Sequence, residues 1–231
     1  MLRLIGFFLI VFVALGVLRT LPVVGGIFAI PLFGFYLAAI LVSVVGARLA
    51  KAAADRMKQK QLERELGGVD TPYNRGKLGL LMLQQGRAKL AVPHLEAALE
   101  ADPSSDEFTY RLGLALLATG DLPGSIEMLE RLTGRNEEHA YGGALLALAR
   151  AQGAYGDGQG SLGTLDRHDR AFGPVPESAY WRGRVLRALG DRAAAAASFA
   201  AVGAIAADQP AYQRRAAATW RLRAQLARLG F

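Results

Sequence analysis

The amino-acid sequence predicts an all-α protein in two parts: an N-terminal two-helix transmembrane hairpin, then an α-solenoid of about four helix pairs with a capping helix. Three observations support this fold class. Residues 4–49 contain only two charged residues. The dipeptides Leu78-Gly79 and Leu112-Gly113 stand 34 positions apart, and so do Gly86 and Gly120. Beyond residue 51, apolar residues recur at the spacing of amphipathic helices.

Residues 1–50 are predicted to form the transmembrane hairpin. Residues 4–18 are an uninterrupted apolar run, and residues 21–47 are a second run without charge. A bilayer core of about 30 Å requires about 20 apolar helical residues. Residues 27–47 meet this requirement, and residues 4–24 meet it if Arg19 reaches the interface. We expect a tight turn near Gly25-Gly26 between the two spans.

Residues 51–71 are predicted to form a basic juxtamembrane helix that ends in a linker at Gly67-Gly68. The cations that follow the second span are Arg48, Lys51, Arg56, Lys58 and Lys60. Positive charge next to a span favours the cytoplasmic side, so both ends of the hairpin and the rest of the chain are expected in the cytoplasm. These cations either contact an anionic leaflet or only determine the topology.

A signal peptide is the alternative interpretation of residues 4–18. The length of this run and the preceding Arg3 suit the hydrophobic region of a signal peptide, although bulky residues occupy the positions where cleavage needs small ones. Cleavage would change the predicted topology.

Residues 72–231 are predicted to form the repeat domain. The first repeat contains Leu78, Gly79, Gly86, Ala91, Leu95, Ala98 and Pro103, and the second contains Leu112, Gly113, Gly120, Ser125, Leu129 and Leu132. This pattern resembles the tetratricopeptide repeat family, and with the hairpin it resembles membrane-anchored bacterial members. The resemblance implies a right-handed α-solenoid with repeats at 72–105, 106–139, 140–175 and 176–209 and a cap at 210–229.

The third repeat departs from the pattern. Gly183 of the fourth repeat lies 70 residues after Gly113, which is two more than two periods. We place Leu146-Ala147 at the Leu-Gly position and expect the insertion in a drawn-out, mobile turn at residues 153–160. The next helix, at about residues 161–172, has acidic side chains near His168. This region is either a specificity loop or divalent-ion site, or a loosened repeat with solvated charges.

The capping helix is predicted at residues 211–229. Its apolar side is expected to carry Trp220, Leu222, Leu226 and Leu229, and arginines occupy the other side. A terminal helix with one polar face would cover the open end of the last repeat.

No catalytic or metal constellation is found in the sequence. There are no cysteines, which removes disulfides and thiolate ligands. His94, His139 and His168 fall in three different repeats without zinc-binding spacing. The glycine-rich residues 156–160 follow a predicted helix, whereas a dinucleotide fingerprint follows a strand. We therefore expect no enzyme activity, no cofactor and no metal.

The resemblance implies a concave groove lined by the first helices of the repeats. The predicted groove residues are Tyr110, Arg111, Tyr141, Tyr180, Trp181, Arg184, Arg187 and Arg214, with Leu145, Leu148 and Gln152 from the third repeat. Aromatic rings interleaved with arginines suit an acidic peptide. Gly76 and Leu80 occupy two positions of the family's clamp for C-terminal carboxylates, which argues against a chaperone-tail receptor.

The sequence therefore predicts a scaffold or adaptor at the inner membrane that binds a protein or peptide partner, with the repeat domain facing the cytoplasm. Small-molecule substrates and nucleic acid are not expected as partners. Two alternatives stay open: the arginines contact anionic lipid or RNA phosphate, or the repeats frame the active site of a membrane enzyme.

Overall fold

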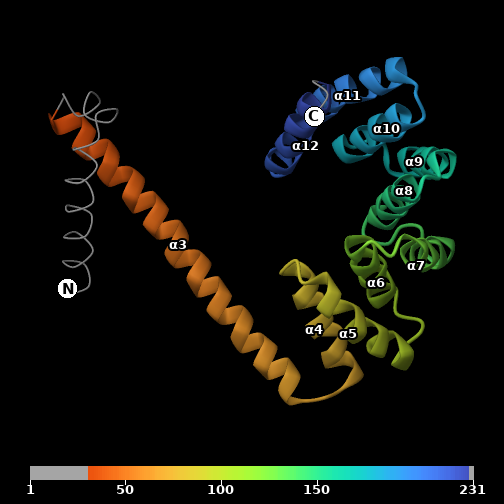
Figure 1. The fold of residues 1–231 in the computed structure, drawn as a ribbon, viewed down its shortest axis with the longest axis horizontal. Coiled ribbons are helices and arrows are strands. Elements are labelled where there is room, and N and C mark those ends of the chain that lie inside the picture. The colour runs from red at the N-terminus through yellow and green to blue at the C-terminus, as the bar shows by residue number, and fades with distance from the viewer. Residues whose placement is uncertain (1–30, 229–231) are drawn as a thin grey trace. The chain divides into compact units, whose positions relative to one another are not determined.

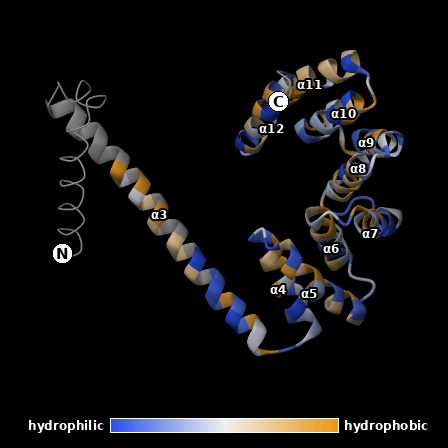
Figure 2. Cartoon of the chain, viewed as in Figure 1, coloured by the Kyte–Doolittle hydropathy of each residue, from blue (hydrophilic) through white to orange (hydrophobic). Residues whose placement is uncertain are grey.

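The computed structural model describes residues 31–228, and all of the regular structure in this range is helical (Figure 1). The chain divides into two compact units, Met1–Arg64 and Glu65–Phe231. The first described helix is α3, Pro31–Gly68. It ends at the predicted Gly67-Gly68, and hydrophilic residues gather toward its C-terminal end (Figure 2).

The predicted first membrane span and the turn at Gly25-Gly26 lie outside the described residues. Among the residues that are described, no helix has both the length and the apolar character needed to cross a membrane.

The second unit is a series of antiparallel helix pairs. The helices are α4 (Pro72–Gln84), α5 (Ala88–Ala101), α6 (Asp106–Thr119), α7 (Leu122–Arg135), α8 (Gly143–Tyr155), α9 (Gly158–Phe172), α10 (Pro176–Ala188), α11 (Arg192–Ala207) and α12 (Arg214–Arg228). In Figure 1 these pairs follow a curve, with α6, α8 and α10 on its inner side and α7 and α9 on its outer side. The predicted α-solenoid is therefore present in this unit.

Each pair turns through a glycine, and in the second, third and fourth pairs an aspartate caps the second helix. The turn glycines have left-handed φ angles, for example +90° at Gly120 and +100° at Gly156, a conformation that costs other residues energy. Asp121, Asp157 and Asp191 then accept hydrogen bonds from backbone amides three residues later, at 3.1, 2.8 and 2.9 Å. These caps satisfy amides that would otherwise lack a partner at the helix start.

Small residues let the two helices of a pair approach closely. A Cβ atom at Gly113 would lie 2.8 Å from Cγ of the fully buried Leu129. A Cβ atom at Gly183 would lie 2.6 Å from the Phe199 ring, which fills the same place in the fourth pair. The leucine-glycine pattern is thus explained by interhelical packing.

The register predicted for the third repeat is wrong by two residues. The Ser125 hydroxyl donates to the Gly113 carbonyl at 2.8 Å, and the Ser161 hydroxyl donates to the Ala149 carbonyl at 2.7 Å. Ala149 is therefore the equivalent of Gly113, so Leu148-Ala149 replaces the predicted Leu146-Ala147 at the Leu-Gly position. The position then recurs 34 residues later at Gly183, the same spacing as from Gly79 to Gly113.

The two extra residues lie before the third pair. The predicted drawn-out turn at residues 153–160 is instead the end of α8, a tight turn at Gly156 and the start of α9. Before α8, the chain passes through three successive left-handed residues, Ala140 (φ +56°), Tyr141 (φ +53°) and Gly142 (φ +78°). Glycine alone adopts this conformation readily, so the connector at 136–142 carries backbone strain.

The capping helix α12 packs against α10 and α11, but with a different face from the one predicted. Its buried residues are Ala217, Ala224 and Ala227, and Trp220 packs beside them. Leu222 and Leu226 are 57% and 44% exposed, so they do not face the core as expected. Alanines allow α12 to lie close to the fourth pair, where leucines would keep it farther away. Leu229 lies outside the described residues.

Candidate protein-interaction groove

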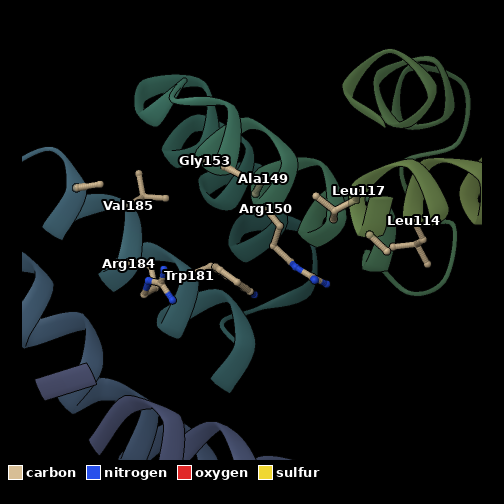
Figure 3. A pocket seen from close by; sticks show the side chains of 11 residues that line it. Leu114, Leu117, Ala149, Arg150, Gly153, Trp181, Arg184 and Val185 are labelled. Atoms are coloured by element: carbon tan, nitrogen blue, oxygen red, sulfur yellow. The ribbon is translucent and has the colours of Figure 1, made fainter. Parts of the chain in front are cut away.

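A pocket of about 320 Å³ opens between the first helices of the second, third and fourth pairs. It is lined by Leu114, Leu117 and Ala118 of α6, by Ala149, Arg150, Gly153 and Ala154 of α8, and by Trp181, Arg184, Val185 and Ala188 of α10. Figure 3 shows the Arg150 side chain extending from α8 into the space between the leucines of α6 and Trp181 of α10. We call this surface the α6–α8–α10 groove.

The center of the groove is an indole ring that contacts two cations. The Arg150 guanidinium carbon lies 5.1 Å from the centroid of the Trp181 ring, and that of Arg184 lies 5.9 Å from it. Both distances are within the range of cation–π attraction. Two guanidinium groups therefore lie at this part of the groove, and the carboxylate of Glu177 beside them balances only one of the two charges.

The Arg150 guanidinium is only partly satisfied by its neighbours. Its Nη1 atom lies 3.8 Å from Oε1 of Glu177, and its Nε atom is buried without a hydrogen-bond partner among the described residues. The buried Nε is closed to a ligand, but the Nη1 end is only loosely paired, and a closer carboxylate could form a charge-assisted hydrogen bond with it. The geometry therefore favours an anionic group at this point of the groove.

The α6 side of the groove is apolar. Leu114 and Leu117 contribute their side chains there, and alanines at 118, 154 and 188 line the three helices at equivalent repeat positions. Small side chains on three neighbouring helices leave the space that the pocket occupies. The groove thus places apolar surface next to two guanidinium groups, a combination suited to a peptide with adjacent apolar and acidic side chains.

Tyr110 and Arg111 lie on α6 at one end of the same surface. Arg111 is bound to Glu107 of its own helix at 2.8 Å and lies over the Tyr110 ring. The Tyr110 ring meets His139 edge-on, with centroids 5.2 Å apart. Burial raises the pKa of the Tyr110 hydroxyl, so this group stays protonated and can donate a hydrogen bond.

The other predicted groove residues have three different environments. Tyr180 is buried and packs against Phe199 and Trp220, so it belongs to the core. Arg187 donates to the carbonyl of Ala227 at 2.9 Å, which links α10 to the end of α12. Arg214 is exposed at the start of α12, and Tyr141 is 93% exposed in the strained connector.

The structure brings Trp181 and Arg184 together in the groove with Arg150, a residue that the sequence prediction missed. The error in register explains the omission, because it selected Leu145, Leu148 and Gln152, which are all buried. In the corrected register, Arg150 occupies the same position as Leu114 and Arg184. The sequence does contain a signal for this register: Gly156 and Gly190 are 34 residues apart, and the same spacing relates Arg150 to Arg184.

The basic residues predicted to lie near a membrane surface are all on α3. Among Arg48, Lys51, Arg56, Lys58 and Lys60, the side chains of Arg56 and Lys60 are described, and both are exposed. Across residues 31–228, no group of three or more histidine, aspartate or glutamate side chains is arranged to hold a metal ion. His168, part of the possible ion site, is buried beside Asp169 at 3.0 Å.

Comparisons with known proteins agree with this architecture. The family model described as tetratricopeptide repeat matches residues 82–149. The crystal structure of a thermophilic tetratricopeptide protein from Thermus thermophilus is similar to this chain, with 26% identity and a TM-score of 0.52 over 68% of this chain and 88% of that chain. No curated protein matches the sequence.

Two crystal structures of MamA share the fold at lower identity. One has 16% identity and a TM-score of 0.53 and covers 75% of this chain and 90% of that chain. The other, MamA from AMB-1, has 14% identity and a TM-score of 0.57 and covers 70% of this chain and 90% of that chain. The described helix pairs therefore form a tetratricopeptide-like solenoid, an architecture suited to protein–protein interaction.

Proposed function

We propose that this chain is a membrane-anchored scaffold that binds an acidic segment of a partner protein in the α6–α8–α10 groove. The observation that carries the proposal is the placement of Arg150 and Arg184 against one indole ring, that of Trp181, beside apolar surface from α6. Arginine and tryptophan are enriched among the residues that dominate binding energy at protein interfaces. The chain itself would carry out no chemical reaction.

The proposed membrane anchor rests on the sequence. Residues 4–18 and 21–47 carry no charge, and five cations follow within residues 48–60. This order of apolar and basic residues is that of a membrane anchor whose following domain stays in the cytoplasm. The inner membrane is accordingly the proposed location.

Partner binding can be tested with two arginine variants of the full chain. Arg184→Gln removes an exposed cation from the groove, and Arg131→Gln removes an exposed cation from α7 on the outer side of the curve. We expect proteins captured from membranes by the original chain to be lost with Arg184→Gln and retained with Arg131→Gln. Equal capture by both variants would contradict binding in the groove.

The nature of the ligand can be tested by its salt dependence. Binding of lipid or RNA phosphate would fall steeply with salt for both arginine variants and would depend little on Trp181. Binding of an acidic protein segment would require the indole as well, so Trp181→Ala would abolish it.

The membrane anchor can be tested with a reporter fused after Phe231. The reporter should be active in the cytoplasm, and activity only outside the cytoplasm would overturn the proposed topology.

A further inference from the structure

We infer that Glu177 is a resident carboxylate of the α6–α8–α10 groove and sets the affinity of the groove for acidic ligands. It partly occupies the cationic site in the free protein, and a partner carboxylate replaces it at Arg150. This inference rests on the proposed function, because it concerns the same groove. It makes Glu177 a specificity-determining residue that weakens binding.

Glu177 interacts with both the indole and the guanidinium at the center of the groove. Its Oε1 atom accepts a hydrogen bond from Nε1 of Trp181 at 3.3 Å and lies 3.8 Å from Nη1 of Arg150. Charge-assisted hydrogen bonds between guanidinium and carboxylate normally measure about 2.7–2.9 Å. The contact with Arg150 is therefore loose, and a carboxylate that approached more closely would replace it.

A comparison with the second pair shows why Glu177 is available for this role. Glu107 holds the same position in α6, and Arg111 follows it one turn later at 2.8 Å. In α10 the residue one turn after Glu177 is Trp181, which offers a single N–H. Glu177 therefore has no arginine on its own helix at this spacing, and its charge is directed toward Arg150 of α8.

The loosely paired Nη1 end of the Arg150 guanidinium is the place that a ligand oxygen would take, because the contact with Glu177 there is long. Nε of Arg150 is buried and has no hydrogen-bond partner within residues 31–228, while the Arg150 side chain as a whole is 36% exposed. Arg184 adds a second positive charge to the same part of the groove, 5.9 Å from the centroid of the Trp181 ring. A ligand carboxylate here would lie near the negative charge of Glu177, and repulsion between the two carboxylates would lower the affinity.

The test measures how a panel of peptides binds to the full chain and its variants. The probe is an array of hexapeptides that combine leucine with glutamate, each paired with a twin in which glutamine replaces glutamate. Glu177→Gln keeps an acceptor for the Trp181 N–H and removes the charge. Glu127→Gln makes the same change of charge on the exposed surface of α7 and is the matched control.

We expect Glu177→Gln to increase the affinity for the glutamate peptides about fivefold, the size of a repulsion between two charges about 4 Å apart when water screens them fully. The affinity for the glutamine twins should stay unchanged, and Glu127→Gln should have no effect. Adding Arg150→Gln to Glu177→Gln should remove the gain. The Trp181 indole N–H resonance should shift when a glutamate peptide binds to the original chain, while that of Trp220 should shift less.

The outcomes separate this inference from the proposed function. If neither the original chain nor Glu177→Gln prefers glutamate peptides over their glutamine twins, the groove does not bind acidic segments and both proposals fail. If the preference is present but Glu177→Gln behaves like Glu127→Gln, only the role of Glu177 is overturned. A lower affinity in Glu177→Gln would likewise overturn it, because it would show that the carboxylate assists binding.

Discussion

The second and third helix pairs are packed alike but are entered by different connections. In both, a serine hydroxyl from the second helix donates to a carbonyl of the first, at 2.8 Å from Ser125 and 2.7 Å from Ser161. Helix α6 begins directly after the cap at Ser105, whereas α8 follows three left-handed residues. The packing inside a pair is thus fixed by close contact, while the connection between pairs accepts two extra residues.

The largest expected effect tests the packing that the two pairs share. Leu129 and Leu165 occupy equivalent positions in α7 and α9, and both side chains are fully buried. Replacing either with alanine should lower the free energy of unfolding by about 3 kcal/mol, because each change removes apolar contacts and leaves a cavity. Urea denaturation followed by circular dichroism would measure the two losses side by side.

Gly163 supplies the control for the register. The register predicted from the sequence would place Gly163 at the buried position, but apart from its chain neighbours and the backbone of its own helix no atom lies within 4 Å of where its Cβ would be. Gly163→Ala in the middle of α9 should therefore raise the stability slightly, by up to about 1 kcal/mol, through its helix propensity. A loss for Gly163→Ala similar to that for Leu129→Ala would contradict the corrected register.

Most of the fold could be predicted from the sequence because it follows from repeated packing positions. The glycines of the Leu-Gly dipeptides at 78 and 112 recur because two helices approach closely there. The turn glycines at 86 and 120 recur because the turn needs a left-handed backbone. The position of the insertion could not be predicted in the same way. Alanine, tyrosine and glycine at 140–142 carry no pattern typical of a left-handed connector.

The groove was less predictable than the fold because it depends on the register and on contacts between helices. A shift of two residues selected buried residues of α8 in place of the partly exposed Arg150. Tyr180 fits the family's groove positions, yet it is covered because Trp220 of the capping helix packs against its ring. Sequence periodicity shows which residues face a neighbouring helix, but it does not show which of them a terminal helix will cover.

A second prediction concerns the charged junction between the third and fourth pairs. Burial alone would raise the pKa of Asp169, but hydrogen bonds from His168, Ser178 and Arg182 outweigh it and hold the pKa below its usual value. Arg182 also binds Asp166, so the junction joins α9 to α10. Asp169→Asn should lower the free energy of unfolding by about 1.5–3 kcal/mol at neutral pH, as expected for hydrogen bonds to a charged group.

The stability difference between Asp169→Asn and the original chain should depend on pH, and the direction follows from the lowered pKa of Asp169. A carboxyl group with a lowered pKa in the folded state stabilises the protein above its unfolded pKa of about 3.9 and loses that effect as the pH falls through the folded pKa. The difference between Asp169→Asn and the original chain should therefore be present at neutral pH and shrink in acid. A difference that stayed constant across this range would show that shape, and not charge, is responsible.

The smallest expected effect tests the connection that distinguishes the third pair. Tyr141 adopts φ +53° and is 93% exposed, so its side chain contributes little packing while its backbone is strained. Left-handed backbone costs a non-glycine residue about 1–2 kcal/mol, and the larger entropy of glycine in the unfolded chain offsets part of that relief. Tyr141→Gly should therefore raise the free energy of unfolding by about 0.5 kcal/mol.

Tyr155 provides the matched control for the same substitution. It is also an exposed tyrosine, at 61%, but it is the last residue of α8 and has helical backbone. Tyr155→Gly should lower the stability by about 0.5–1 kcal/mol, because glycine is disfavoured in a helix. Opposite signs for the two variants in urea denaturation would locate the strain in the connector at 136–142. If Tyr141→Gly also lowered the stability, the tyrosine would be held there by contacts worth more than the strain, and the connector would have to be regarded as a packed part of the third pair.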